Sequence, residues 1–346
     1  MDSLLCEEEL LDSPYTPECP WEPQHRDLLT SGLYLSLEAE DCKDALGVYL
    51  EKEAAYAPEH GYAGRLRAGM LVDSRIMAVK WMAQCHERFN LSWETIFCAI
   101  NLLDRFISVN PSSKLKGWLI ELLSVACLST AAKLQEVHVP PLLELQLDGF
   151  DHLFQPSLVQ RTELHVSASL SWRLNAVTAY SFMDPLIGCL ELACPRVRSN
   201  LTNRVTQLLL GAMFDINFLD FCPCTVAVAG IRCGLDELLP LQSNGLMCNL
   251  HKLIPHGRMD ELGTCFALME EHVVNPTAYR HSYSPSSPVS VLANDRIKIV
   301  DCLVDLPPFK NSEIFFGLPS NPKKRMREPE NCEANSPARK NDTHKN

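Results

Sequence analysis

The sequence lacks the short motifs that mark common nucleotide-binding and hydrolytic sites. It contains no Gly-x-Gly-x-x-Gly, no Walker loop, no His-Glu-x-x-His and no Gly-x-Ser-x-Gly. Two histidines five positions apart, His251 and His256, are within reach of one metal ion in principle, but Pro255 and Gly257 beside them indicate a loop. We therefore predict no catalytic site, no metal and no cofactor.

The chain also lacks an excess of positive charge and any Cys-x-x-Cys pair. Its 31 Lys and Arg against 43 Asp and Glu give a net charge of −12. This balance disfavours a general nucleic-acid or anionic-membrane binder. The 15 cysteines are scattered, and the acidic N-terminus is unlike a signal peptide. We expect an intracellular protein whose reduced thiols pack as small apolar side chains.

No apolar run reaches the length of a membrane span. The most apolar helical segment, from Trp118 to Ala132, has 15 residues (118 to 132), whereas a bilayer needs about 20. Only Glu121, Ser124, Ser129 and Thr130 are polar within it. A helix that is apolar on every side and too short for a bilayer is a central core helix.

A helical pattern fills the chain from about Ala45 to about Val273, without a convincing strand. We predict an all-α fold of two consecutive helical bundles with disordered tails. The predicted parts are an acidic tail at 1–40, a first bundle at 41–174, a second at 175–275 and a polar tail at 276–346. The predicted helices cover 44–57, 66–89, 93–108, 117–135, 140–147, 156–173, 178–193, 200–215, 223–238, 243–254 and 258–273.

An aspartate stands out in the helix that follows the N-cap residue Ser92. Asp104 lies on the same helical row as Phe97, Ile100 and Ile107. A carboxylate among apolar neighbours is costly unless it is paired. Arg75 opens another apolar helical run, so we predict a buried ion pair between Arg75 and Asp104.

Two further charges occupy positions that fit two interpretations. Glu163 lies on a buried-looking row with Val159 and Val166, and Lys133 ends the apolar core helix. In the structural interpretation, which spacing alone favours, Lys133 caps carbonyl groups and Glu163 finds a local partner. In the other, Lys133 and Glu163 meet at one edge of the bundle and are offered to a partner protein.

Three stretches resemble the cyclin box, namely Ser74–Trp81, Asn101–Ser108 and Ala126–Glu136. A fourth, Val139–Gln146, is similar to D-type cyclins of the plant kind. The resemblance is strong over 70–175 and only architectural over 178–273. It implies an all-α fold of two consecutive five-helix cyclin-box bundles with disordered N- and C-terminal tails.

This resemblance implies a non-catalytic regulatory subunit that binds and activates a cyclin-dependent kinase. By motif match, Arg75 and Asp104 tie the first helix to the second, Lys133 and Glu163 contact the kinase, and Leu122 is the core leucine. A kinase inhibitor protein is a further partner that the family leaves open.

The family's substrate-docking patch is only partly retained. Met77 and Trp81 are present, but Ser74 and Ala78 stand where the family usually has Met and Leu. We therefore list Met77 and Trp81 as a candidate docking patch.

Near the N-terminus the sequence reads Leu4-x-Cys6-x-Glu8. In an extended chain these three side chains point the same way, so the segment suits docking as a strand. The resemblance implies binding to a retinoblastoma-related protein, which the bound kinase then phosphorylates at the G1/S transition. The alternative is a solvated acidic tail.

The C-terminal tail carries a basic cluster typical of nuclear import signals, formed by Lys323, Lys324, Arg325 and Arg327. We expect a nuclear protein, with shuttling to the cytoplasm left open, and the alternative is a generic solubilising tail. Candidate proline-directed phosphorylation sites are Ser336, Ser284 and Thr16. Two other functions are open: a cyclin-fold transcription factor or adaptor, and an all-α enzyme.

Overall fold

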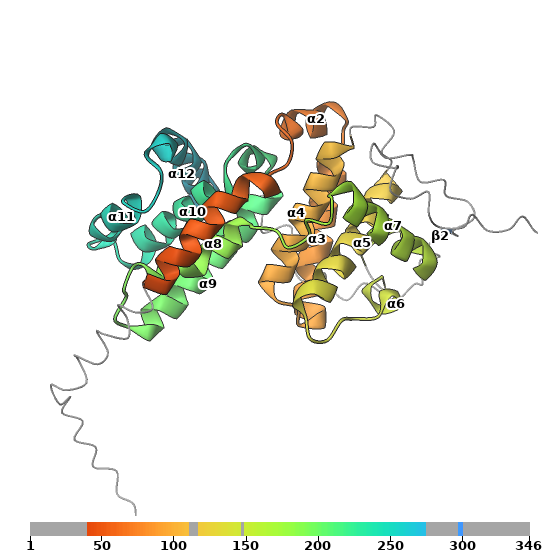
Figure 1. The fold of residues 1–346 in the computed structure, drawn as a ribbon, viewed down its shortest axis with the longest axis horizontal. Helices are drawn as coiled ribbons and strands as arrows, with labels where there is room; N and C mark the ends of the chain where they lie inside the picture. Colours follow the sequence, from red (N-terminus) through yellow and green to blue (C-terminus); the bar gives the residue numbers. More distant parts are fainter. Residues whose placement is uncertain (1–39, 111–116, 147–148, 275–296, 300–346) are drawn as a thin grey trace, which may run out of the picture.

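A computed structural model of the chain shows two consecutive five-helix bundles, preceded by a helix at residues 40–52 (Figure 1). The first bundle contains α3 to α7 and the second contains α8 to α12. The residues that the structure describes are 40–110, 117–146, 149–274 and 297–299.

The first bundle is built around α5, which packs against α3, α4 and α7. Helix α4 begins at its predicted cap, where the Ser92 hydroxyl accepts a hydrogen bond from the Thr95 backbone N–H at 3.2 Å. Leu122, near the middle of α5, is fully buried. The helices of this bundle are α3 (Val72–Phe89), α4 (Trp93–Val109), α5 (Gly117–Gln135), α6 (Leu142–Leu145) and α7 (Pro156–Ser169).

Helix α5 is longer than its apolar segment suggests. It has 19 residues, so length alone does not exclude a membrane span, contrary to the argument from residues 118–132. Among the described residues it is the one helix long and apolar enough to cross a membrane. However, 72% of its most apolar window is buried inside the protein. Burial by α3, α4 and α7, and not length, therefore explains its composition.

The second bundle surrounds α10, which packs against α8, α9 and α12. Thr178 and Ser181 form a reciprocal capping box that starts the first helix of this bundle. At Gly234, an added Cβ would lie 2.9 Å from Leu201 Cδ1, so glycine is what allows α9 and α10 to approach closely there. The helices are α8 (Ala179–Gly188), α9 (Pro195–Phe214), α10 (Pro223–Leu238), α11 (Ser243–His251) and α12 (Met259–Val274).

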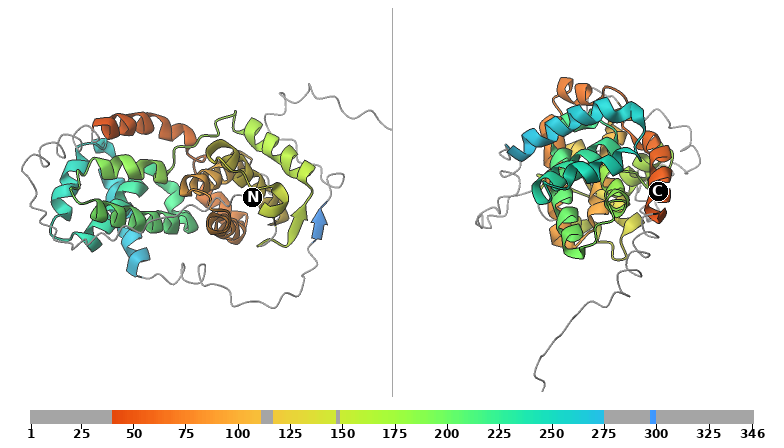
Figure 2. Two further views of the ribbon diagram at one scale, coloured as in Figure 1. Left: turned by 90° about the horizontal axis from the view of Figure 1, so that it is seen from below. Right: turned by 90° about the vertical axis from the view of Figure 1, so that its left-hand side faces the viewer.

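The helix at residues 40–52 lies alongside the second bundle, although it precedes the first in sequence (Figures 1 and 2). Tyr49 packs edge-on against Phe182 of α8, with ring centroids 5.7 Å apart. In the following turn η1 (Glu53–Tyr56), the buried Glu53 accepts a hydrogen bond from the Cys224 N–H at 3.1 Å and pairs with Arg258. Sequence order predicted this helix as part of the first bundle, whereas its packing places it against the second.

The predicted helix 66–89 is interrupted. It consists of α2 (Tyr62–Ala68) and α3, separated by Met70 with a φ of +52°. The Leu71 N–H donates a hydrogen bond to the Leu66 carbonyl at 3.0 Å, a pattern typical of helix C-termini. The prediction of a single helix was wrong. The apolar pattern of the sequence continues through this break and therefore does not reveal it.

Helix α7 also ends before the predicted residue 173. Ser171 and Trp172 adopt φ values of +53° and +60°, and the Trp172 N–H bonds the Ser167 carbonyl at 2.8 Å. Tertiary hydrogen bonds fix the residues that follow, because Arg105 donates to the Arg173 carbonyl at 2.8 Å. The ends of α6, α8, α9 and α11 differ from the predicted ranges by a few residues as well.

Two short strands correct the expectation that nothing but helix is ordered. Strand β1 (His152–Phe154) pairs in parallel with β2 (Ile297–Ile299). The second strand belongs to the region 276–346 that the sequence predicted as disordered tail. The rest of that region, and residues 1–39, lie outside the described residues.

Candidate functional site

The structure brings Arg75 of α3 and Asp104 of α4 together in the interior. Arg75 Nε donates to Asp104 Oδ1 at 2.7 Å and Nη2 donates to Oδ2 at 2.8 Å. The two side chains are only 1% and 4% exposed. This two-point geometry satisfies the carboxylate that interrupts the apolar row of α4.

Two further partners of this pair were not predicted from the sequence. The Tyr62 hydroxyl donates to Asp104 Oδ1 at 2.8 Å, and Arg75 Nη1 donates to the Met213 carbonyl of α9 at 2.7 Å. Arg75 therefore joins both bundles. Burial opposes the charge of Arg75, but the Asp104 carboxylate outweighs it and raises the pKa of Arg75. Burial, followed by the negative charge of Asp104, holds the pKa of Tyr62 well above its ordinary value, so the phenol remains a neutral donor.

Lys133 and Glu163 meet at the surface where α5 and α7 pack together. Lys133 Nζ lies 2.7 Å from Glu163 Oε1 and 2.7 Å from Oε2. The Lys133 side chain is 46% exposed and that of Glu163 is 13% exposed. Of the two interpretations drawn from the sequence, the geometry matches the one in which these charges meet at an edge of the bundle.

Exposed apolar side chains follow Lys133 and Glu163 in the chain. Leu134 is 50% exposed, Val137 is 89% exposed, and Leu164 is 43% exposed. We call Lys133, Glu163 and these three residues the α5–α7 edge. A charged pair whose neighbours in the chain are exposed apolar residues has the composition of a protein-docking surface.

Glu136 fixes the end of α5 next to this edge, and sequence reasoning missed it. Its Oε1 accepts hydrogen bonds from the Ser92 N–H at 2.7 Å, the Ser92 hydroxyl at 2.9 Å and the Thr95 hydroxyl at 2.5 Å. Partial burial favours the protonated acid, but these bonds outweigh it and lower the pKa of Glu136. The carboxylate thereby ties the C-terminal end of α5 to the first turn of α4.

The two residues of the candidate docking patch differ in exposure. Met77 is 50% exposed on α3, whereas Trp81 is only 3% exposed. The Trp81 ring lies against Phe150, with centroids 4.6 Å apart. Ala78, which replaces a family leucine, is fully buried. Trp81 thus contributes almost no surface beside Met77.

Several predicted sites lie outside the described residues. They are Leu4, Cys6 and Glu8, the basic residues Lys323, Lys324, Arg325 and Arg327, and the candidate phosphorylation sites Thr16, Ser284 and Ser336.

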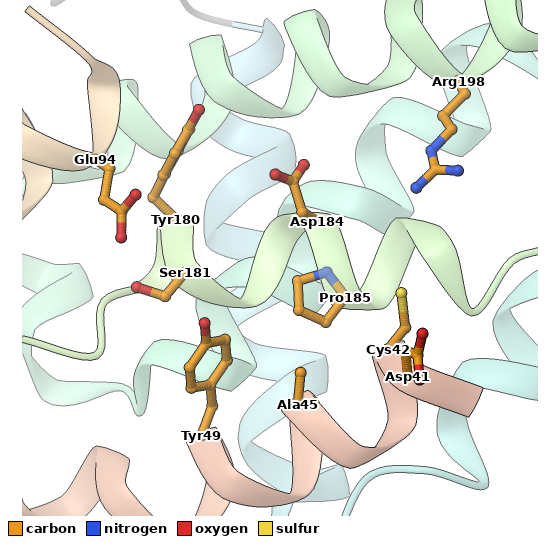
Figure 3. Close-up of a pocket in the computed structure, with 10 residues that line it drawn as sticks. All are labelled: Asp41, Cys42, Ala45, Tyr49, Glu94, Tyr180, Ser181, Asp184, Pro185 and Arg198. Atoms are coloured by element: carbon orange, nitrogen blue, oxygen red, sulfur yellow. The ribbon is translucent and has the colours of Figure 1, made fainter. Parts of the chain in front are cut away.

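An open pocket of about 510 Å³ lies where helix 40–52 meets α8 (Figure 3). Its lining includes the carboxylates Asp41, Glu94 and Asp184 and the phenols Tyr49 and Tyr180. Nothing in the sequence pattern predicted it. In the part of the chain that the structure describes, no group of three or more His, Cys, Asp or Glu side chains is placed to hold a metal ion.

Six buried cysteines are free thiols, namely Cys85, Cys98, Cys127, Cys224, Cys233 and Cys265. Burial raises the pKa of Cys85 to about 12 and, with smaller contributions from neighbouring groups, that of Cys98 to about 11. Such thiols stay protonated and pack as apolar groups, as the scattered cysteine pattern predicted.

Comparison with known proteins finds that the family described as "Cyclin, N-terminal domain" matches residues 44–175. Cyclin-D2-1 of Oryza sativa subsp. japonica is 33% identical over 224 residues, covering 64% of this chain and 68% of the relative. Cyclin-D4-1 of Arabidopsis thaliana is 31% identical over 269 residues, covering 75% of this chain and 84% of the relative.

Cyclin-D1-2 of Oryza sativa subsp. japonica is 30% identical over 246 residues, covering 67% of this chain and 66% of the relative. Among solved structures, a viral cyclin from herpesvirus saimiri is 19% identical with a TM-score of 0.40, covering 57% of this chain and 87% of that one. The matched family domain covers α2 to α7, which include the Arg75–Asp104 pair and the α5–α7 edge. The chain belongs to the cyclins and, within them, to the D-type cyclins of the plant kind.

Proposed function

We propose that this D-type cyclin binds and activates a cyclin-dependent Ser/Thr kinase and directs it to a retinoblastoma-related protein, promoting the G1/S transition. The observation that carries the proposal is the α5–α7 edge. It combines a partly exposed ion pair with exposed apolar side chains that follow its two members in the chain. The chain acts as a regulatory subunit, and the kinase supplies the chemistry.

The rigidity of this edge suits it to activating a kinase. Protein kinases require an assembled pair between a β3 lysine and an αC glutamate. A helical face that contacts only the active arrangement shifts an existing equilibrium toward it. Moving that equilibrium from 1:99 to 99:1 requires about 5.5 kcal/mol of differential contact. Helix α5 packs against α3, α4 and α7 and is buried over most of its length. Lys133 therefore extends from a helix that is anchored in the core of the bundle.

The direct test combines the purified chain with a cyclin-dependent kinase and a retinoblastoma-related fragment. The kinase is expected to phosphorylate the fragment only when the chain is present, and the chain alone is expected to be inactive. Turnover by the isolated chain would favour the enzyme alternative. Salt-dependent DNA binding without kinase activation would favour a cyclin-fold transcription factor, a class that the net charge of −12 disfavours.

The N-terminal motif is the proposed contact with the retinoblastoma-related protein. Cys6→Gly removes the apolar side chain between Leu4 and Glu8, so binding to that protein is expected to fall by roughly ten-fold or more, as for loss of a small buried anchor. Kinase activation should be unchanged, because the motif lies outside the cyclin domain match. Binding is measured by titration with a purified retinoblastoma-related pocket fragment.

Cys19→Gly makes the same substitution in the same N-terminal region and serves as the matched control. If Cys6→Gly and Cys19→Gly bind the fragment as tightly as the wild type, the acidic segment is only a solvated tail.

The basic cluster is the proposed nuclear import signal. Replacing Lys323, Lys324 and Arg325 by alanine is expected to leave a fluorescently tagged chain in the cytoplasm, because import receptors bind clustered positive charge. The matched control replaces Arg339, Lys340 and Lys345, which removes the same positive charge from the same region. A nuclear signal that survives the first substitution but not the second would assign import to the distal residues.

A further inference from the structure

Strand β1 is held on one side by side chains of the first bundle. Glu121 Oε2 of α5 accepts hydrogen bonds from the His152 backbone N–H at 3.2 Å and lies 3.0 Å from the His152 ring Nδ1. Gln146 Oε1 accepts from the Phe154 N–H at 2.8 Å, and Phe154 is buried. The backbone N–H groups of residues 152 and 154 are therefore satisfied by the bundle.

The opposite edge of β1 pairs with a segment from far along the chain. Backbone N–H groups alternate in direction along an extended strand, so the Gln155 N–H points the other way. It donates to the Ile299 carbonyl at 3.3 Å. The register pairs Leu153 with Lys298 and Phe154 with Ile299, and Ile299 packs against the hydrophobic core. Figure 2 shows the two arrows side by side at the end of the first bundle.

This contact is too small to be permanent by its own strength. Three paired positions at roughly 0.2–1 kcal/mol each supply only about 0.6–3 kcal/mol. Burial of the Ile299 side chain against the core adds to these pairs. Because the segment belongs to the same chain, its effective concentration at the edge is also of the order of millimolar, and the two effects together keep the contact occupied. The same contact opens readily, and opening leaves the Gln155 N–H and an apolar site without their partner strand.

We propose that the edge of β1 that carries the Gln155 N–H is a peptide-docking site whose resident occupant is the chain's own segment Ile297–Ile299. The site adds an extended segment as a parallel strand, with main-chain hydrogen bonds and one apolar side chain at the position of Ile299. While the segment is docked, the chain that follows α12 in the second bundle is attached to the first bundle. This proposal does not depend on kinase binding.

The test uses the full chain and a fluorescent peptide of residues 294–301, followed by anisotropy. Ile299→Asp places a charge at the apolar position and should vacate the edge. The peptide is expected to bind the Ile299→Asp chain roughly ten-fold or more tightly than the wild type, whose edge is filled from within. Ile314→Asp, the same change in the same C-terminal region, should behave as the wild type. Equal binding to wild type and Ile299→Asp, or none to either, would overturn the proposal.

Hydrogen exchange provides a second measurement that needs no peptide. Ile299→Asp is expected to speed exchange of the Gln155 amide by roughly ten-fold or more, because its acceptor leaves. The Phe154 amide, held by Gln146, should keep its rate and shows that the bundle stays folded. An unchanged Gln155 rate would equally overturn the proposal.

Discussion

Replacing Asp104 by alanine is expected to lower the free energy of unfolding by about 3–5 kcal/mol, because the Arg75 guanidinium is then left buried without a counter-charge. The Arg75 side chain is 1% exposed, so water cannot take the place of the lost carboxylate. Its hydrogen bond to the Met213 carbonyl would remain, but that carbonyl carries no charge, and the Tyr62 hydroxyl would lose its acceptor as well. Urea denaturation followed by circular dichroism measures the loss.

The matched control is Glu237→Ala, which removes the partner of Arg204 between α9 and α10. That pair has the same two-point geometry, at 2.6 and 2.7 Å, but its side chains are 31% and 34% exposed. Its loss should cost no more than about 1 kcal/mol, since solvent screens an exposed pair. Equal losses from the two substitutions would show that burial of the Arg75–Asp104 pair is not what makes it important.

The double substitution Arg75→Met with Asp104→Leu separates an unpaired charge from a simple loss of packing. Replacing both members of a buried ion pair by apolar side chains is often close to neutral. The double variant is therefore expected to be more stable than Asp104→Ala. If it is less stable, the penalty of the single change comes from lost packing.

Reversing the charge of Lys133 should strongly weaken kinase binding without unfolding the chain. In Lys133→Glu a second carboxylate faces Glu163, so the α5–α7 edge changes from a neutral pair to two like charges. Truncating or reversing one member of such an interface pair costs about 2–5 kcal/mol, or roughly thirty-fold or more in affinity. Because the Lys133 side chain is 46% exposed, the new carboxylate stays hydrated and the fold is retained. Binding is measured by titration with the purified kinase, and stability by urea denaturation.

Two variants sharpen this result. Glu163→Ala leaves the Lys133 cation without its carboxylate, and it should also weaken kinase binding and activation. Arg204→Glu reverses the charge of a comparable pair in the second bundle, and it should leave kinase binding unchanged. Full kinase binding by Lys133→Glu would show that the α5–α7 edge is not the docking surface.

The Arg75–Asp104 pair could be predicted from the sequence because a charge in an apolar row is conspicuous. For Lys133 and Glu163, spacing alone favoured separate structural roles. Asp104 lies on a row with Ile100 and Ile107, and Glu163 lies on one with Val159 and Val166. A buried carboxylate needs a cation as its partner, and few Lys or Arg residues lie within apolar helical segments as Arg75 does. By contrast, nothing local marked Glu136, because its three hydrogen bonds depend on how closely the end of α5 approaches the start of α4.

The sequence by itself determined which segments are helical and which charges must be neutralised. Apolar periodicity, the cap at Ser92 and the proline that opens α10 act within a few residues. The tertiary structure alone decided what joins distant parts of the chain. It selected the Met213 carbonyl for Arg75, placed helix 40–52 on the second bundle and paired β1 with β2. The need for a partner follows from a group's own chemistry, whereas the identity of that partner depends on which surfaces packing brings within hydrogen-bonding distance.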